Sequence, residues 1–136
     1  MLLSLLLACS TASSSTAPLA GSMSTAAPAP GARHDADMAT FRAARDRGAV
    51  GMILDVRTPE EFATGHVPGA VNVPIDALAS RMGALAGEQG KEIYVICAVG
   101  GRSSVAADQL AAAGFSATNV LGGTDAWVAS GGAVER

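Results

Sequence analysis

The feature that most constrains the fold of this chain is an apolar run, Ile93–Cys97, which a short glycine-containing turn joins to an Ala-rich stretch. The turn, Ala98–Arg102, predicts a change from strand to helix, and the helix is expected over Ser103–Ala113. A lone thiol, that of Cys97, therefore lies at the carboxyl end of a predicted strand. Strands that alternate with helices in this way are typical of α/β folds.

Such a turn points backbone N–H groups and the positive end of a helix at one spot. We therefore expect the pKa of Cys97 to be lowered and an anion to bind over its sulfur. Gly100 and Gly101 are expected to curl the backbone around the sulfur, because glycine adopts positive φ at little cost. Arg102 either holds an oxyanion through two parallel hydrogen bonds or braces the turn through a carboxylate. Ser103 is expected to cap the helix, and it can also face the site.

Further segments repeat the alternation of strand and helix. Strands are expected at Val50–Val56, Val71–Val73 and Asn119–Leu121, and helices at Met38–Arg47, from Pro59 to just before Gly65, at Ile75–Leu85 and at Asp125–Ala129. Asp35 or Asp37 caps the first helix, and Thr58, Pro59 and Glu61 form a capping box for the second. The pattern predicts a parallel sheet covered on both faces, with ligands bound outside the carboxyl ends of its strands.

Composition excludes some classes of function. The chain has 136 residues, a net charge of −3 and no basic stripe, so we expect one domain that does not bind nucleic acid. The two cysteines, Cys9 and Cys97, lie in segments of very different character. A disulfide between them is therefore not expected, and each sulfur needs its own explanation.

The N-terminal segment has the character of an export signal. Residues 1–8 are mostly apolar, and Leu6-Leu7-Ala8-Cys9 resembles a bacterial lipobox, in which the cysteine becomes lipid-modified. Residues 9–33 are rich in Ser, Thr, Ala and Pro and are expected to form a flexible linker to a folded domain over 34–136. We expect a lipid-anchored monomer of the periplasm or cell envelope. An incidental, unstructured start is the alternative.

Three ordered motifs resemble those of the rhodanese (sulfurtransferase) family. Leu54–Phe62, continued by Gly65–Pro74, is similar to its N-terminal motif. Cys97–Ser103 resembles its active-site loop, and Leu121–Trp127 its closing motif. The resemblance covers residues 34–136. It implies an α/β fold with a parallel five-stranded sheet and helices on both faces.

The resemblance also implies a chemistry. Cys97 would take the outer sulfur of thiosulfate or a related persulfide or polysulfide donor, and the resulting persulfide would pass it to cyanide or a thiol. The family needs no metal or organic cofactor. The partners would be small sulfur-containing anions and thiophilic acceptors, and a sulfur-relay protein is a further candidate. The substrate-binding loop would comprise Ala98, Val99, Gly100, Gly101, Arg102 and Ser103.

Other functions remain open. The resemblance implies that phosphatases and arsenate reductases of the same fold have five residues between the cysteine and the arginine. In this chain four residues separate Cys97 from Arg102. The shorter loop favours a sulfur atom over a tetrahedral phosphate. An envelope persulfide carrier or sulfide-responsive binding module with little turnover is a second alternative. A purely structural role would require Cys97 to be dispensable.

Several polar residues of the motifs have a structural interpretation that we favour. Asp55 and Arg57 are expected to support the loop as an ion pair rather than touch substrate. His66 is expected to stabilise a turn rather than act as a general base, because a thiolate of lowered pKa needs none. Glu60 and Glu61 are first-turn helix acids. Trp127 is expected to pack in the core.

Overall fold

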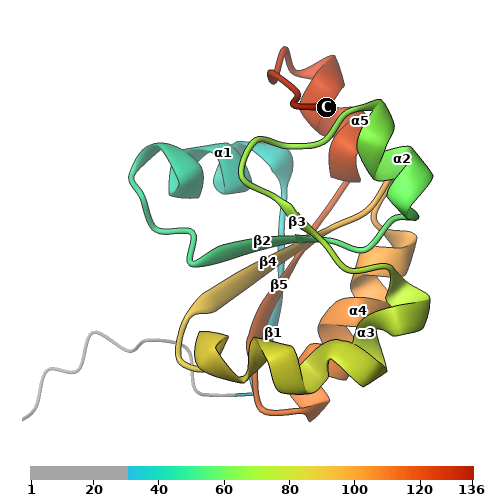
Figure 1. The fold of residues 1–136 in the computed structure, drawn as a ribbon. Coiled ribbons are helices and arrows are strands. Elements are labelled where there is room, and N and C mark those ends of the chain that lie inside the picture. The colour runs from blue at the N-terminus through green and yellow to red at the C-terminus, as the bar shows by residue number, and fades with distance from the viewer. Residues whose placement is uncertain (1–30) are drawn as a thin grey trace, which may run out of the picture.

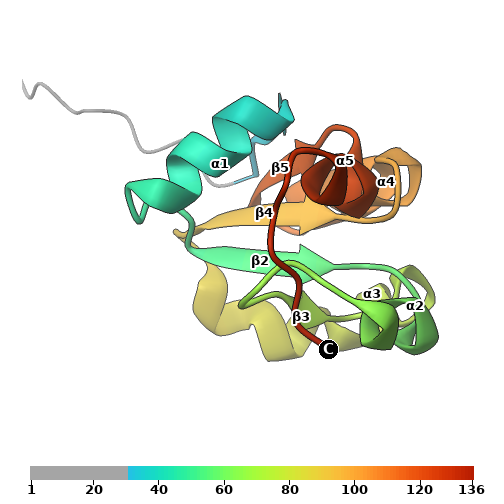
Figure 2. The same cartoon turned by 90° about the horizontal axis from the view of Figure 1, so that it is seen from above.

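The computed structural model describes residues 31–136, which form a five-stranded parallel sheet with the strand order β1-β5-β4-β2-β3 (Figures 1 and 2). The α/β fold class is confirmed. The strands are β1 (Arg33–Ala36), β2 (Met52–Asp55), β3 (Val71–Asn72), β4 (Glu92–Ile96) and β5 (Ser116–Val120). The helices are α1 (Met38–Asp46), α2 (Pro59–Thr64), α3 (Ile75–Arg81), the 3₁₀ helix η1 (Met82–Glu88), α4 (Gly101–Ala112) and α5 (Gly123–Ala129).

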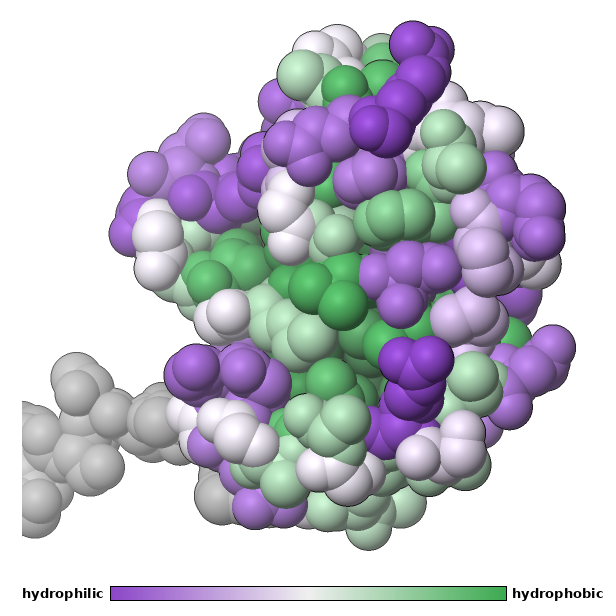
Figure 3. Space-filling view, in the orientation of Figure 1, coloured by the Kyte–Doolittle hydropathy of each residue, from purple (hydrophilic) through white to green (hydrophobic). Residues whose placement is uncertain are grey.

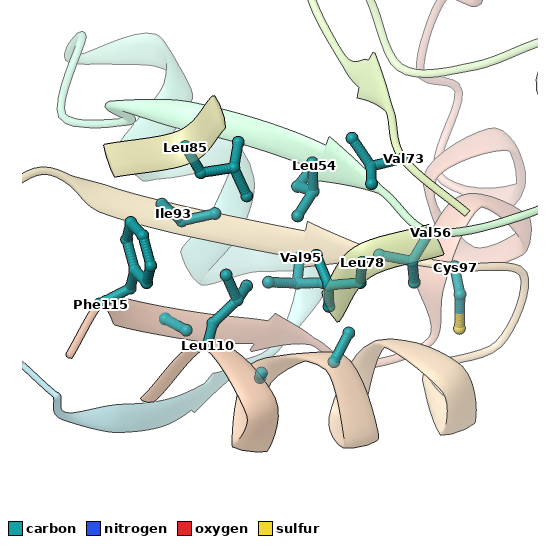
Figure 4. Close-up of a cluster of buried hydrophobic side chains, with 13 residues drawn as sticks. Leu54, Val56, Val73, Leu78, Leu85, Ile93, Val95, Cys97, Leu110 and Phe115 are labelled. Carbon is teal, nitrogen blue, oxygen red and sulfur yellow. The ribbon is translucent and has the colours of Figure 1, made fainter. Parts of the chain in front are cut away.

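Helices cover both faces of the sheet (Figure 1). One face packs against α3, η1 and α4, through a cluster that includes Leu54, Val95 and Leu110 (Figure 4). The other face packs against α1 and α5, where Phe41 and Trp127 lie in one cluster. Strands β2 and β4 contribute to both clusters, because successive side chains of a strand point to opposite faces. The carboxyl ends of the strands meet at the edge where α4 and α5 begin.

The caps of α1 and α2 follow from the sequence. Asp37, rather than Asp35, caps α1 by accepting a hydrogen bond from the Thr40 N–H at 2.7 Å. The capping box of α2 is confirmed: Thr58 accepts from the Glu61 N–H, and Glu61 accepts from the Thr58 N–H. These contacts set the start of α2 directly after β2.

Several elements differ from expectation. Strand β5 begins at Ser116, three residues before the expected strand, and α4 begins at Gly101, two residues before the expected helix. The helix expected over Ile75–Leu85 ends at Arg81 and continues as the 3₁₀ helix η1, which contains Gly83 and Gly87; glycine is among the weakest helix formers. Strand β1 was not expected at all. It begins at Arg33, the last position of the expected linker, and it is held by parallel pairing with β5.

The edge strand β3 has only two residues, a length that limits pairing with other chains. The face seen in Figure 3 carries a band of apolar surface across its middle, between hydrophilic margins. Within residues 31–136, no helix is long and apolar enough to cross a membrane. The predicted signal and lipid attachment at Cys9 lie outside the described residues.

Candidate active site

Cys97 directly follows β4, in the loop that leads to α4. The residue is 1% exposed and lies at the margin of the core cluster, where its sulfur points away from the other labelled side chains (Figure 4). Burial alone would describe an inert core cysteine. The contacts of the sulfur decide between that interpretation and a reactive thiol.

The loop backbone donates to the sulfur of Cys97. The Gly100 N–H lies 3.0 Å from Sγ, and the Ser103 hydroxyl lies 3.4 Å from it. Burial raises the pKa of the Cys97 thiol, but the hydrogen bonds outweigh burial, so that the pKa lies below its ordinary value. The donors are the Ser103 hydroxyl and the backbone N–H groups of Ser103, Gly100 and Val99. Their arrangement stabilises a thiolate.

The Ser103 hydroxyl has one proton and three acceptors within reach. It donates to the Asn119 side-chain carbonyl at 2.6 Å, and the Gly100 carbonyl lies at 3.2 Å. Asn119 is itself fixed by a bond from its amide to Asp35. The backbone N–H groups are therefore the constant donors to the sulfur, and the hydroxyl adds a further bond when it turns from Asn119.

The first turn of α5 holds the loop from outside. The Thr124 N–H donates to the Cys97 carbonyl at 2.8 Å, and the Asp125 N–H donates to the Ala98 carbonyl at 3.0 Å. In a trans peptide the C=O and N–H bonds point in opposite directions. Turning the Ala98 carbonyl toward α5 therefore turns the Val99 N–H away from α5, toward the sulfur to which it donates.

Close approach of α5 to the loop requires glycine at position 123. Gly123 has φ +59°, and a Cβ there would lie 2.4 Å from the Cys97 carbonyl oxygen. Gly100 has φ +107°, as expected. The positive φ expected of Gly101 is wrong: this residue begins α4, and a Cβ there would meet nothing within 4 Å.

Arg102 forms a two-pronged ion pair with Glu61. The two guanidinium nitrogens lie 2.8 and 2.9 Å from the two carboxylate oxygens. Arg102 lowers the pKa of Glu61, with help from the Thr58 N–H, to about 2. Of the two roles left open by the sequence, the structure shows Arg102 bracing the loop against α2. The contact joins two motifs that lie 41 residues apart in the chain.

Ser103 does not cap α4, contrary to expectation, because the helix begins two residues earlier at Gly101. The residue is fully buried within the first turn. Ala98 and Val99 complete the loop, and Val99 is 67% exposed. The loop thus presents an apolar side chain to solvent beside a buried sulfur.

Asp55 and Arg57 pair with each other at the end of β2. The shortest contact is 2.7 Å, both side chains are buried, and Arg57 also donates to the Gly65 carbonyl at 2.9 Å. The Asn72 amide donates to both of their backbone carbonyls. This arrangement ties the start of α2, its end and β3 together.

His66 and Trp127 contact groups outside the loop. The His66 ring stacks on Phe62, bonds the Phe62 carbonyl through Nδ1 and lies near Glu135. Trp127 is buried and donates to the Ala133 carbonyl. Residues 31–136 contain no group of three or more His, Cys, Asp or Glu side chains that could hold a metal ion.

Sequence reasoning missed three contributors to this site. The sequence places Glu61 only at the start of a helix. The signal for its further role is that one of the two roles expected of Arg102 needs a carboxylate, and Glu61 lies in the first motif. Asn119 reaches Ser103 only because β5 lies beside α4. The glycine pair at 122–123 marked a strand end, but its role as the support of the Cys97 loop required the fold.

We expect Gly123→Ala to destabilise the protein by roughly 2–5 kcal/mol, through overlap with the Cys97 carbonyl and left-handed strain. Urea unfolding measures the loss. Gly131→Ala is the matched control, because Gly131 also has positive φ (+83°) but a Cβ there would meet nothing within 4 Å. A loss no greater than that of the control would contradict the close packing of α5 on the loop.

We expect Ser103→Ala to raise the pKa of Cys97, because one of the donors that lower it is removed. The measurement is the pH dependence of alkylation of the Cys97-containing peptide, read by mass spectrometry so that Cys9 does not contribute. The midpoint should move to higher pH. Ser104→Ala is the control, since its hydroxyl contacts Arg33 and not the sulfur; an equal shift in both variants would argue against a direct effect.

Comparison with known proteins agrees with this geometry. The model of the family described as Rhodanese-like domain matches residues 37–130. Thiosulfate sulfurtransferase 16, chloroplastic, of Arabidopsis thaliana is 38% identical over 94 residues, which cover 57% of this chain and 74% of that protein. The Putative sulfur carrier protein YrkF of Bacillus subtilis is 40% identical over 76 residues, 55% of this chain. This chain spans only 40% of that relative's length.

Solved structures show the same fold. The crystal structure of a rhodanese-related protein from Thermoplasma volcanium superimposes with a TM-score of 0.68 and 31% identity, covering 75% of this chain and 97% of that one. The family match includes the loop after β4 and the motifs around α2 and α5. The chain belongs to the rhodanese-like domain family.

Proposed function

We propose that this chain is a sulfurtransferase that carries sulfane sulfur on Cys97 as a persulfide. The donor would be thiosulfate or a related persulfide or polysulfide, and the acceptor a thiophile such as cyanide or a thiol. The single observation that carries the proposal is the set of loop donors that lowers the pKa of Cys97 at the carboxyl edge of the sheet. The name of the Arabidopsis relative, a thiosulfate sulfurtransferase, supports the same activity.

The transfer proceeds by two displacements at sulfur. The Cys97 thiolate attacks the outer sulfur of the donor, the donor's S–S bond breaks, and the electron pair leaves with the inner fragment, which is sulfite for thiosulfate or a thiolate for an alkyl persulfide. The acceptor then attacks the outer sulfur of the persulfide, and Cys97 leaves as a thiolate. A cysteine of lowered pKa serves both as nucleophile and as leaving group.

The other loop residues have supporting roles in this scheme. The N–H groups of Val99 and Gly100 stabilise negative charge on the Cys97 sulfur, and they do so without being consumed. Asp55 and Arg57 hold the end of β2 beside the loop. The Ser103 hydroxyl stabilises negative charge on the Cys97 sulfur when it donates a hydrogen bond to it. No general base is needed, and His66 has its contacts elsewhere.

Phosphoryl chemistry fits this loop less well. A phosphatase would need the arginine after the cysteine to grip the phosphate oxygens. Here Arg102 has both its terminal nitrogens engaged by Glu61. The short loop and the occupied arginine both favour sulfur transfer.

A persulfide carrier is the second candidate function, and the name of the Bacillus relative, Putative sulfur carrier protein YrkF, favours it. In that case Cys97 is sulfurated, but a partner supplies or removes the sulfur and the isolated protein turns over slowly. Turnover of thiosulfate with cyanide separates the two candidates. Negligible turnover with a stable Cys97 persulfide would identify the carrier.

We expect Cys97→Ser to abolish both sulfur transfer and the added mass of sulfur on the protein, because serine has no nucleophilic sulfur. Circular dichroism should show that the fold is retained, since the substitution changes little volume. Cys9→Ser is the matched control and should transfer sulfur at the rate of the unaltered chain. Activity retained by Cys97→Ser would overturn the mechanism.

Localisation is a separate proposal. A lipid on Cys9 would anchor the protein at the cell envelope, with residues 10–30 between the anchor and the described domain. Mass spectrometry of the protein expressed in a bacterium with lipoprotein processing tests this. We expect a chain that begins at Cys9 and carries the added mass of a diacylglycerol group; an unmodified Cys9 within an intact N-terminus would contradict it.

A further inference from the structure

We propose that Glu61 selects the sulfur donor: by neutralising Arg102, it makes the site favour donors with little charge at the reacting sulfur, such as alkyl persulfides, over the thiosulfate dianion. The inference rests on the proposed sulfur transfer and names its substrate class. Glu61 is thus a positioning residue that acts through Arg102.

The geometry of the ion pair carries the first step. Arg102 lies in the first turn of α4, next to the loop, and both its terminal nitrogens face the Glu61 carboxylate at 2.8 and 2.9 Å. Each side chain remains about one-third exposed, so the pair lies at the surface of the site rather than in the core. An arginine so paired has its two-pronged face occupied and offers an incoming anion no uncompensated charge.

No other lysine or arginine among residues 31–136 supplies the positive charge that Arg102 would offer to an anion at the loop. All nine lysines and arginines lie within residues 31–136. Arg57, the other cation at this edge of the sheet, is buried against Asp55. Among the described residues, no other lysine or arginine makes a hydrogen bond or ion pair with the loop 97–103.

An acidic residue also adjoins the loop. Asp125 is exposed in the first turn of α5, and its N–H donates to the Ala98 carbonyl. The charges cancel within the Arg57–Asp55 pair and within the Arg102–Glu61 pair. Asp125 therefore gives the surroundings of the loop a net negative charge. A second anion approaching this edge is therefore repelled rather than attracted.

The charge of the reaction separates the two classes of donor. When the Cys97 thiolate attacks thiosulfate, the complex carries three negative charges, and the leaving sulfite takes two of them. When it attacks a neutral alkyl persulfide, RS–SH, the complex carries one, and the thiolate RS⁻ takes it while the proton stays on the transferred sulfur. The backbone N–H groups can stabilise one charge on sulfur. Within residues 31–136, however, the arginines beside the loop, Arg102 and Arg57, are both paired, so neither is free for the sulfonate of thiosulfate.

The rim of the loop suits an organic donor. Val99 is 67% exposed in the loop itself, and Leu121 is 47% exposed directly after β5. Leu121 lies close to the loop, because a Cβ on Gly100 would lie 3.8 Å from the Leu121 Cα. These apolar side chains can contact the carbon portion of an alkyl persulfide, and thiosulfate has none.

The test compares kcat/KM for thiosulfate and for glutathione persulfide, with cyanide as the common acceptor so that both donors give thiocyanate. Persulfide formation on Cys97 is followed by mass spectrometry. In Glu61→Gln, Arg102 is freed while the amide can still accept at the capping box. We expect kcat/KM for thiosulfate to rise by about tenfold, the equivalent of one charge-assisted hydrogen bond, with little change for glutathione persulfide.

Two further variants isolate the cause. Glu60→Gln removes the same charge from the same helix turn but leaves the ion pair intact, so its donor ratio should match that of the unaltered chain. In Glu61→Gln/Arg102→Gln the gain with thiosulfate should vanish, because the freed cation is gone. A gain that persists in the double variant, or that appears equally in Glu60→Gln, would overturn the proposal.

The unaltered chain gives an independent test that needs no variant to fold. Salt screens charge, so kcat/KM for thiosulfate should hold or rise with ionic strength if the site repels the dianion. A steep fall would show that a free cation attracts it and would refute the donor selection. If no donor produces a Cys97 persulfide, the proposed function fails; if the persulfide forms but Glu61→Gln leaves the donor ratio unchanged, only this inference fails.

Discussion

Two backbone hydrogen bonds, from the first turn of α5 to the carbonyls of Cys97 and Ala98, hold the arrangement on which the site depends. They turn both carbonyls outward, and the Val99 N–H, which follows the Ala98 carbonyl, therefore points inward, toward sulfur. The contact is possible only because residue 123 has no side chain. A buried thiol that would otherwise be a small core hydrophobe is in this way surrounded by donors, and the pKa of Cys97 falls despite burial.

Charge at this edge of the sheet is arranged in pairs. Asp55 holds Arg57 in the interior, and Glu61 holds Arg102 at the surface. The interior pair joins β2, β3 and α2 through backbone carbonyls as well as through charge. Because both arginines are engaged, the uncharged N–H groups of the loop stabilise the thiolate. A loop of this kind stabilises a single negative charge on sulfur better than it stabilises an anion whose several charges are distributed over many atoms.

Hydrophobic runs and caps predicted most of the fold. The alternation around Ile93–Ala113 and the cap at Thr58 depend on neighbouring residues only, and the structure reproduces them; of the two caps open for α1, it selects Asp37. Strand β1 and the first half of β5 escaped prediction because they are polar. All five residues of β5 are buried, yet Ser116, Thr118 and Asn119 find partners in Glu92, Asp35 and Ser103. Such partners come from other strands and helices, so no local pattern reveals them.

The sequence by itself determined the fold class, the family and the position of Cys97 at the end of a strand, because these follow from periodicity, glycine placement and motifs that are contiguous in the chain. Only the tertiary structure decided what the neighbouring groups do. It paired Arg102 with Glu61 and brought Asn119 to Ser103, and it placed α5 on the Cys97 loop. These contacts join residues that are distant in sequence. A side chain such as that of Arg102 has several potential partners in the sequence, and the packing of the sheet and helices determines which of them lies within hydrogen-bond distance.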